Sequence, residues 1–229
     1  MKKLLTLIAI AVISLSVNAQ KDVTTFLGIP VDGTKAEMIQ KLKAKGFTST
    51  SYGKDIILEG EFNGTKVDVH IGTNGDKVYR IMVADANTTN ETNIKIRFNN
   101  LCRQFEKNGK YIVFNNQEIP EDEDISTQIS VYDKRYQASY YQKPDMEKID
   151  TLYMQQEYFS RLSEKFTLEQ IQNPTEEIKT EMLDIAENLE FDILTKKSVW
   201  FMISKLNYDE YYIVMYYDNE YNHADGEDL

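Results

Sequence analysis

The sequence predicts an α+β protein in which a mostly antiparallel sheet, or sheets, is covered by amphipathic helices. Residues 199–203 and 211–217 are two runs rich in aromatic and β-branched side chains, and the short polar loop between them predicts a β-hairpin. Three shorter strand-like runs, separated by Asn-Gly turns, fall between residues 55 and 84. Two clear apolar stripes with helical spacing lie elsewhere. Strands and helices come in groups, which is typical of α+β proteins.

The N-terminal residues 1–19 have the pattern of a secretory signal peptide. Lys2 and Lys3 precede an apolar stretch over residues 4–17, and small residues lead to Ala19. Cleavage after Ala19 would leave Gln20 as the first mature residue. We therefore expect an exported protein, located in the periplasm or outside the cell. No later stretch is long and apolar enough to span a bilayer, so the mature chain is expected to have no transmembrane segment.

The chain is acidic and nearly free of cysteine. Its 26 basic and 37 acidic residues give a net charge of −11, and loss of Lys2 and Lys3 leaves 24 − 37 = −13. A negative surface repels phosphate backbones and anionic lipids, so nucleic-acid and peripheral membrane binding are not expected. A single cysteine, Cys102, cannot form an internal disulfide. The mature residues 20–229 are numerous enough for a hydrophobic core as one domain, or as two subdomains over 20–114 and 128–229.

The first half contains a helix followed by three strands. Thr34 and Glu37 form a capping-box pattern ahead of an apolar stripe, and Gly46 is placed to end the helix. Strands are expected over residues 55–62, 65–73 and 77–84.

The second half begins with a helix over residues 91–107, whose apolar residues are spaced four, three and four apart. We expect this helix to cover the three preceding strands. A strand over 111–114, a loop over 115–127 and one or two strands over 130–142 follow. A helix is expected within 144–172. Another is expected to start at Asn173 and Pro174, a cap residue followed by proline, and to lead into the C-terminal hairpin.

Pairs of titratable residues suggest catalysis only weakly. Asp68 and His70 share one strand face, and so do Glu59 and Glu61. Paired carboxylates can hydrolyse glycosides when they are held at a set separation in a cleft. Both pairs also fit an ordinary solvated strand face, and that interpretation is favoured. No catalytic residue is assigned from the sequence.

Metal and cofactor sites are not predicted either. Cys102 lies on a helical apolar stripe, which favours a buried and inert thiol. The acidic segment 218–222 places oxygen ligands at alternate positions, but His223 and Leu229 stand where a calcium loop needs Gly and Glu. The acidic run 121–124 is typical of a solvated loop.

The C-terminal hairpin is rich in tyrosine: six of the 15 tyrosines fall within residues 208–221. Exposed tyrosines on a sheet would suit a contact surface for a protein or a carbohydrate, whereas tyrosines at the edge of the core would be structural. The core interpretation is favoured, and the alternative stays open.

Two segments carry a resemblance to a known family. FLGIPVDGTKAEMIQKLKAKGF at residues 26–47 and YYIVMYYDNEYNHADGEDL at residues 211–229 resemble a family of exported proteins of Gram-negative gut bacteria. The resemblance implies an envelope or secreted location and brings no activity, cofactor or catalytic residue.

The sequence therefore favours an exported protein that binds an unidentified protein or glycan and is not an enzyme. A hydrolase with a non-standard carboxylate site, using Glu59 or Glu61, is the second hypothesis. A structural envelope component is the third. Asp150, Thr151 and Leu152 match a short O-glycosylation pattern of exported bacterial proteins, with Thr151 as the acceptor, although the same residues could cap a helix.

Overall fold

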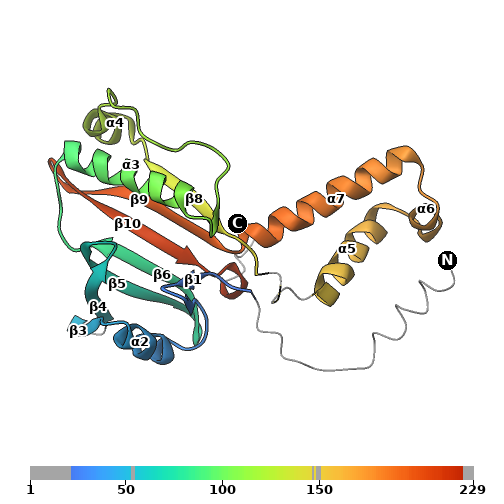
Figure 1. Cartoon of the computed structure of the whole chain (residues 1–229), viewed down its shortest axis with the longest axis horizontal. Coiled ribbons are helices and arrows are strands. Elements are labelled where there is room, and N and C mark those ends of the chain that lie inside the picture. Colours follow the sequence, from blue (N-terminus) through green and yellow to red (C-terminus); the bar gives the residue numbers. More distant parts are fainter. Residues whose placement is uncertain (1–21, 53–54, 146, 148–150, 224–229) are drawn as a thin grey trace.

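A computed structural model of the chain describes residues 22–52, 55–145, 147 and 151–223 (Figure 1). The expected signal peptide, with its cleavage site at Ala19 and Gln20, lies outside the described residues. None of the described helices is both long and apolar enough to cross a membrane.

An eight-stranded sheet forms the centre of the protein, with the strand order β3-β4-β5-β6-β10-β9-β8-β7. Every neighbouring pair of strands is antiparallel. The predicted α+β class with an antiparallel sheet is confirmed. The strands are β3 (Thr48–Tyr52), β4 (Asp55–Phe62), β5 (Thr65–Asn74), β6 (Lys77–Asp85), β7 (Tyr111–Ile112), β8 (Gln137–Gln142), β9 (Ser198–Asn207) and β10 (Glu210–Asp218).

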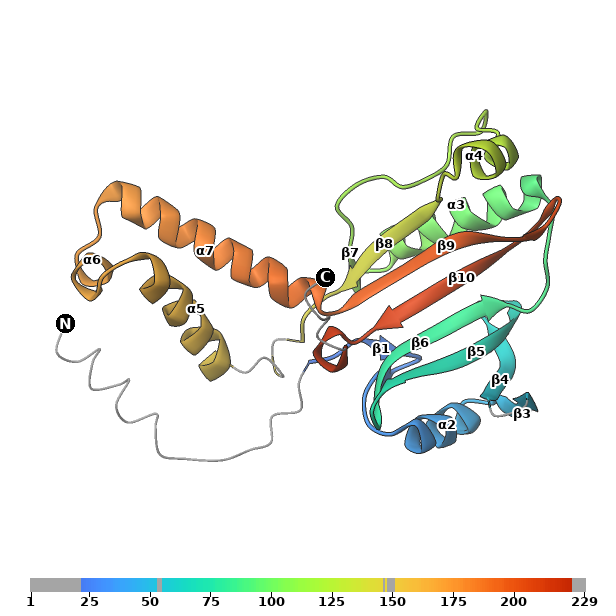
Figure 2. The ribbon, with the colours of Figure 1, turned by 180° about the vertical axis from the view of Figure 1, so that it is seen from behind.

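The sheet consists of two similar halves. Helix α2 (Lys35–Ala44) precedes the meander β3 to β6, and helix α3 (Glu91–Lys107) precedes the strands β7 to β10. The halves join where β6 pairs antiparallel with β10, so the strand order of the second half mirrors that of the first. Both helices lie on the same face of the sheet (Figure 1). Figure 2 shows the opposite, open face, with no described helix across its central strands.

Local sequence signals account for both helices. Thr34 and Glu37 form the predicted capping box at the start of α2, and Gly46 takes the left-handed conformation just beyond its end (φ 98°). Asn90 caps α3, whose buried stripe includes Phe98 and Phe105. The expectation that α3 covers the first three strands is wrong. Helix α2 packs on that half, and α3 packs on β7, β9 and β10.

The C-terminal hairpin lies at the centre of the sheet, as predicted, because β10 pairs with β6 and β9 pairs with β8. Ile213 and Met215 belong to the core beneath the helices, whereas Val214 faces the open side and is also buried. Ring contacts between Phe98 and Phe201 (4.9 Å between centroids) join α3 to β9. The last strand of the chain therefore completes the core of both halves.

Strand β3 and helix α4 differ from the sequence prediction. Strand β3 was not predicted, because its polar sequence TSTSY has no apolar alternation and the strand lies at the sheet edge. Part of the strand expected over 130–142 is instead helix α4 (Ile125–Tyr132). The Asp124 side chain accepts a hydrogen bond from the Thr127 amide and caps α4, and Asp133 ends it in the left-handed conformation.

Three helices form an arm that projects away from the sheet between β8 and β9 (Figure 1). They are α5 (Thr151–Lys165), α6 (Leu168–Gln172) and α7 (Glu176–Thr195). The predicted start of α7 is wrong. Its cap is Thr175, whose hydroxyl accepts from the Ile178 amide, while Asn173 ends α6.

A small sheet of β1 (Thr25–Phe26) and β2 (Ile29–Pro30) lies at the N-terminal end. The Gln142 side chain holds it to β8 through a pair of hydrogen bonds with the amide and carbonyl of Thr25, at 2.8 and 2.7 Å. A short 3₁₀ turn, η1 (Glu220–Asn222), follows β10.

Candidate functional site

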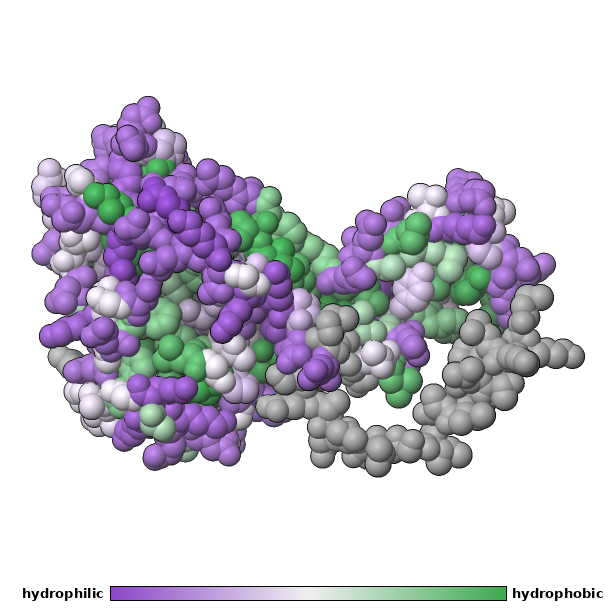
Figure 3. Space-filling model, in the orientation of Figure 1, coloured by the Kyte–Doolittle hydropathy of each residue, from purple (hydrophilic) through white to green (hydrophobic). Residues whose placement is uncertain are grey.

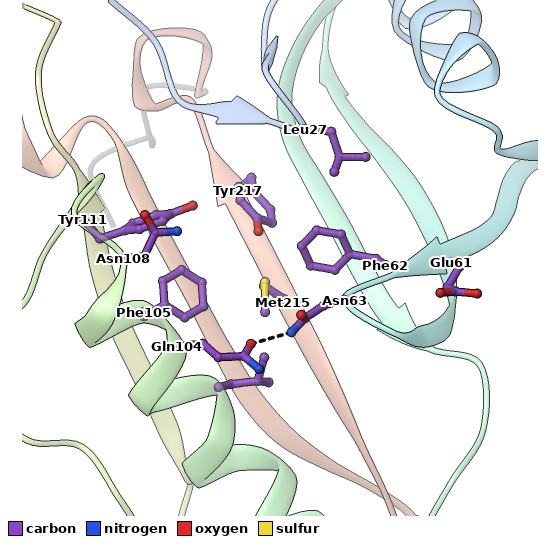
Figure 4. A pocket seen from close by; sticks show the side chains of 11 residues that line it. Leu27, Glu61, Phe62, Asn63, Gln104, Phe105, Asn108, Tyr111, Met215 and Tyr217 are labelled. Carbon is purple, nitrogen blue, oxygen red and sulfur yellow. Dashed lines mark hydrogen bonds between the residues drawn. The ribbon is translucent and has the colours of Figure 1, made fainter.

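A cleft of about 310 Å³ opens on the helix-covered face, between α3 and the turn that joins β4 to β5 (Figure 4). We call it the central cleft. Figure 3 shows apolar surface at this position, between α3 and α2. The residues that line it come from both halves of the protein: Leu27, Glu61, Phe62, Asn63, Leu101, Gln104, Phe105, Asn108, Tyr111, Met215 and Tyr217.

The floor and walls of the central cleft follow from strand and helix periodicity. Met215 and Tyr217 are two residues apart on β10, so both point toward the helices and form the floor. Leu101 and Phe105 are four apart on α3 and share its apolar face. Phe62, the last residue of β4, faces them across the cleft (Figure 4).

The rim of the central cleft is polar. The Asn63 amide donates a 2.6 Å hydrogen bond to Gln104 Oε1 and so links the two halves of the protein at the mouth (Figure 4). Asn63 is in the left-handed conformation (φ 53°) that an Asn-Gly turn requires. Asn108, the residue that ends α3, adds a third amide side chain. These amides provide both donors and acceptors to anything that enters.

The two phenols at the cleft are neutral hydroxyl groups rather than bases. Burial raises the pKa of Tyr217 well above its usual value, and the neighbouring Tyr111 hydroxyl raises it further by Coulombic interaction and by accepting a hydrogen bond. Burial also raises the pKa of Tyr111. Glu61 is the only charged residue among the described residues that line the cleft, and its carboxylate is turned away from Met215 (Figure 4). The geometry suits binding of an uncharged group.

The structure does not bring the predicted carboxylates together in a cleft. Glu59 and Glu61 are both exposed on the open side of β4, and only Glu61 reaches the rim of the central cleft. Asp68 lies directly opposite Glu59 on β5, which places two like charges side by side. His70 is half-buried on the same open face, opposite Met82.

Cys102 is fully buried on α3, as predicted. Burial raises the pKa of its thiol to about 11. A thiol with this pKa carries little thiolate at neutral pH, so Cys102 is not a nucleophile. Among the described residues, no group of three or more His, Cys, Asp or Glu side chains is arranged to hold a metal ion.

The tyrosines of the C-terminal hairpin divide between the two faces of the sheet. Tyr211 and Tyr217 are buried in the core. On the open face, Tyr216 stacks on Trp200, with 4.0 Å between centroids and 16° between planes. The guanidinium of Arg80 lies 5.0 Å from the Tyr216 ring centroid. The rings largely cover one another, which supports a structural role for much of the cluster.

Asp218 holds this open-face cluster together. It accepts two hydrogen bonds from Arg80, at 2.5 and 2.9 Å, and one from the Trp200 indole, at 2.8 Å. The hydrogen bond to Asp218 and the Asp218 charge raise the pKa of Arg80 despite partial burial. The sequence contained no local signal for this cluster, because Arg80 and Asp218 are far apart in the chain.

Thr151 is exposed at the start of α5, and its glycosylation stays a prediction.

Sequence reasoning did not identify the residues of the central cleft as a site. The Asn63-Gly64 pair was recognised only as a turn, and its proximity to Gln104 and Met215 depends on how the two halves join.

No family model, curated protein or solved structure matches the chain.

Proposed function

We propose that this protein is an exported binding protein of the bacterial envelope or exterior, and that the central cleft binds a neutral mono- or disaccharide. One observation carries the proposal: the cleft combines aromatic walls with three amide side chains, and none of the described residues directs a charge into it. Its volume of about 310 Å³ is at the lower end of small-molecule pockets.

A sugar ring matches this lining on both counts. Its C–H face is apolar and packs against rings such as Phe62 and Phe105. Its hydroxyl groups both donate and accept, as the side chains of Asn63, Gln104 and Asn108 do. An anionic ligand is disfavoured by the net charge of −11.

The hydrolase hypothesis has less support. A glycosidase needs two carboxyl groups on either side of the bond that is cleaved. Among the described residues, Glu61 is the only carboxylate that lines the central cleft. The phenols of Tyr111 and Tyr217, whose pKa values are raised by burial, are neutral and do not supply the second carboxyl group. A purely structural envelope role would leave the polar rim of the cleft without a purpose.

Export is supported by the pattern of residues 1–19 and by the resemblance to exported proteins. The mass of the intact protein from its native host should correspond to a chain that begins at Gln20. A mass that includes residues 1–19 would disprove export by this route.

Ligand binding is tested by isothermal titration of the mature protein with the monosaccharides glucose, galactose and N-acetylglucosamine, with maltose, cellobiose, lactose and diacetylchitobiose, and with digalacturonate as an anionic control. At least one neutral sugar should bind, and digalacturonate should not. Gln104→Ala and Asn108→Ala should each weaken binding about tenfold, because each removes a hydrogen-bonding group from the rim.

Asn87→Ala is the matched control, since Asn87 is exposed and does not line the cleft. It should bind like the wild type. If none of the neutral sugars binds, or if Gln104→Ala binds with unchanged affinity, the central cleft is not a saccharide site.

A further inference from the structure

The arm of α5, α6 and α7 is not needed to connect the strands on either side of it. Strands β8 and β9 are antiparallel neighbours, with Tyr141 opposite Ser198. The Gln142 amide donates to the Lys197 carbonyl at 3.0 Å, so the chain leaves and re-enters the sheet at adjacent points. Neighbours of this kind are commonly joined by turns of two to five residues. We therefore infer that the three inserted helices have a function that is separate from connecting β8 to β9.

The arm has an internal interface that holds α5 against α7. Leu162 and Leu189 are buried. Arg161 forms a 2.8 Å ion pair with Asp192, and the Tyr158 hydroxyl donates to the carbonyl of Met182 at 3.1 Å. The apolar stripes of the two helices are therefore partly used within the arm itself.

A second set of apolar side chains on the arm remains exposed. Figure 3 shows apolar surface on the arm, well separated from the central cleft. Half of the exposed large apolar side chains in the described part of the chain belong to the arm or to Phe114, whose ring lies 5.9 Å from that of Phe191. Those of the arm are Leu152, Tyr153, Phe159, Leu168, Leu183 and Phe191.

The arm also carries most of the negative charge of the protein. Residues 151–195 contain ten acidic and three basic side chains, which gives 3 − 10 = −7 of the total of −11. Several of the acidic residues stand beside the exposed apolar ones, as Asp184 and Glu187 do around Leu183 on α7. An apolar surface within a strongly acidic one favours a partner with the complementary pattern.

We propose that the arm is a docking surface for a positively charged protein that inserts apolar side chains between the exposed residues of α5 and α7. The charge of −7 repels a second copy of the arm and an anionic membrane. This inference is independent of ligand binding in the central cleft, which lies on the sheet and not on the arm.

The test uses the whole mature protein and one probe, a fluorescein-labelled amphipathic helical peptide of leucine and lysine, with binding followed by anisotropy. The wild type should bind the probe, and added salt should weaken binding. Leu183→Ser should weaken it about tenfold by removing an exposed apolar contact. Asp184→Lys with Glu187→Lys should also weaken it about tenfold.

Matched controls are available outside the arm. Ile96→Ser removes an exposed apolar side chain from α3, and Glu121→Lys with Asp122→Lys makes the same charge change in an exposed loop. Both should bind the probe within about twofold of the wild type. The replaced residues in every variant are exposed, and circular dichroism should confirm that each variant folds.

Three outcomes would overturn the proposal. The first is that the probe does not bind the wild type. The second is that the arm variants and the controls weaken binding equally. The peptide would then be attracted only by the net charge of the whole protein. The third is that the arm variants leave binding of the peptide unchanged, but abolish self-association in the ultracentrifuge or binding to phosphatidylglycerol vesicles. In that case a second copy or a membrane is the occupant of the arm.

Discussion

Lys197 Nζ lies 2.7 and 2.8 Å from the two carboxylate oxygens of Asp22. The same ammonium group donates to the Lys143 carbonyl at 3.1 Å, and Asp22 accepts from the Asp145 amide at 2.7 Å. Three segments meet at this ion pair: the beginning of the described chain, the segment that leaves β8 and the segment that enters β9. The pair therefore fixes the base of the arm to the sheet.

Lys197→Met should destabilise the protein by about 3–5 kcal/mol, because it leaves the Asp22 carboxylate without its cation in a site where the two side chains are only 5% and 12% exposed. Asp22→Asn with Lys197→Met should recover part of this loss. Both are measured by urea unfolding as a double-mutant cycle. Lys179→Met breaks the exposed pair with Glu176 and should cost less than about 0.5 kcal/mol. Equal effects at the two pairs would contradict the anchoring role of Lys197.

Two buried tyrosine hydroxyls should respond in opposite ways to removal. The Tyr211 hydroxyl has no hydrogen-bond partner among the described residues, so Tyr211→Phe should leave the free energy of unfolding unchanged or raise it by up to about 1 kcal/mol. The Tyr217 hydroxyl donates to Tyr111, so Tyr217→Phe should lower it by about 1 kcal/mol. Thermal unfolding shows which of the two variants is more stable. If Tyr217→Phe is more stable than Tyr211→Phe, the core is packed differently around β10.

Cys102 should resist thiol reagents until the protein unfolds, because its side chain is fully buried and its pKa is about 11. Ellman's reagent at pH 8 should react only after guanidinium is added. The unfolded thiol has a pKa of about 8.5. Between about pH 8.5 and about 11 the unfolded thiol loses its proton while the folded thiol keeps it. The stability that this group contributes at lower pH is therefore lost as pH rises from about 8.5 through about 11. Rapid labelling of the native protein would show that the Cys102 side chain faces solvent and not the core.

Val214→Asp should lower the free energy of unfolding by about 3 kcal/mol or more, since Val214 is 5% exposed and the new carboxylate would have no cation beside it. Met202 and Ala84 lie directly across from it on the neighbouring strands. Tyr208→Asp introduces the same group in the turn between β9 and β10, where the side chain is 88% exposed, and should cost less than about 0.5 kcal/mol. Urea midpoints that hardly differ between the two variants would mean that β10 is not central.

The elements with strong periodicity could be predicted from the sequence. The stripe that includes Phe98 and Phe105 gave the bounds of α3 correctly, and Asn-Gly turns placed β4, β5 and β6. Strand β3 and helix α4 could not be predicted in this way. The first has no apolar alternation, and the second contains β-branched and aromatic residues that favour a strand in isolation.

The candidate site was beyond local reasoning. Its floor, walls and rim come from the segments around Phe62, Phe105 and Met215, and these meet only because β6 pairs with β10. The choice of helix over each half was missed for the same reason. Spacing patterns identify which face of a helix is apolar, but they do not state which strands will lie beneath it.

The central position of β10 has a consequence for the order in which the protein can fold. Ala84 and Val214 pair across the junction of the halves, although 214 − 84 = 130 positions separate them in the chain. Until β10 has been synthesised, β6 and β9 each present an unpaired edge, and closing a loop of this length is slow. The two halves of the sheet therefore cannot join until β10 has emerged from the ribosome, because β10 supplies the strand that pairs with both β6 and β9.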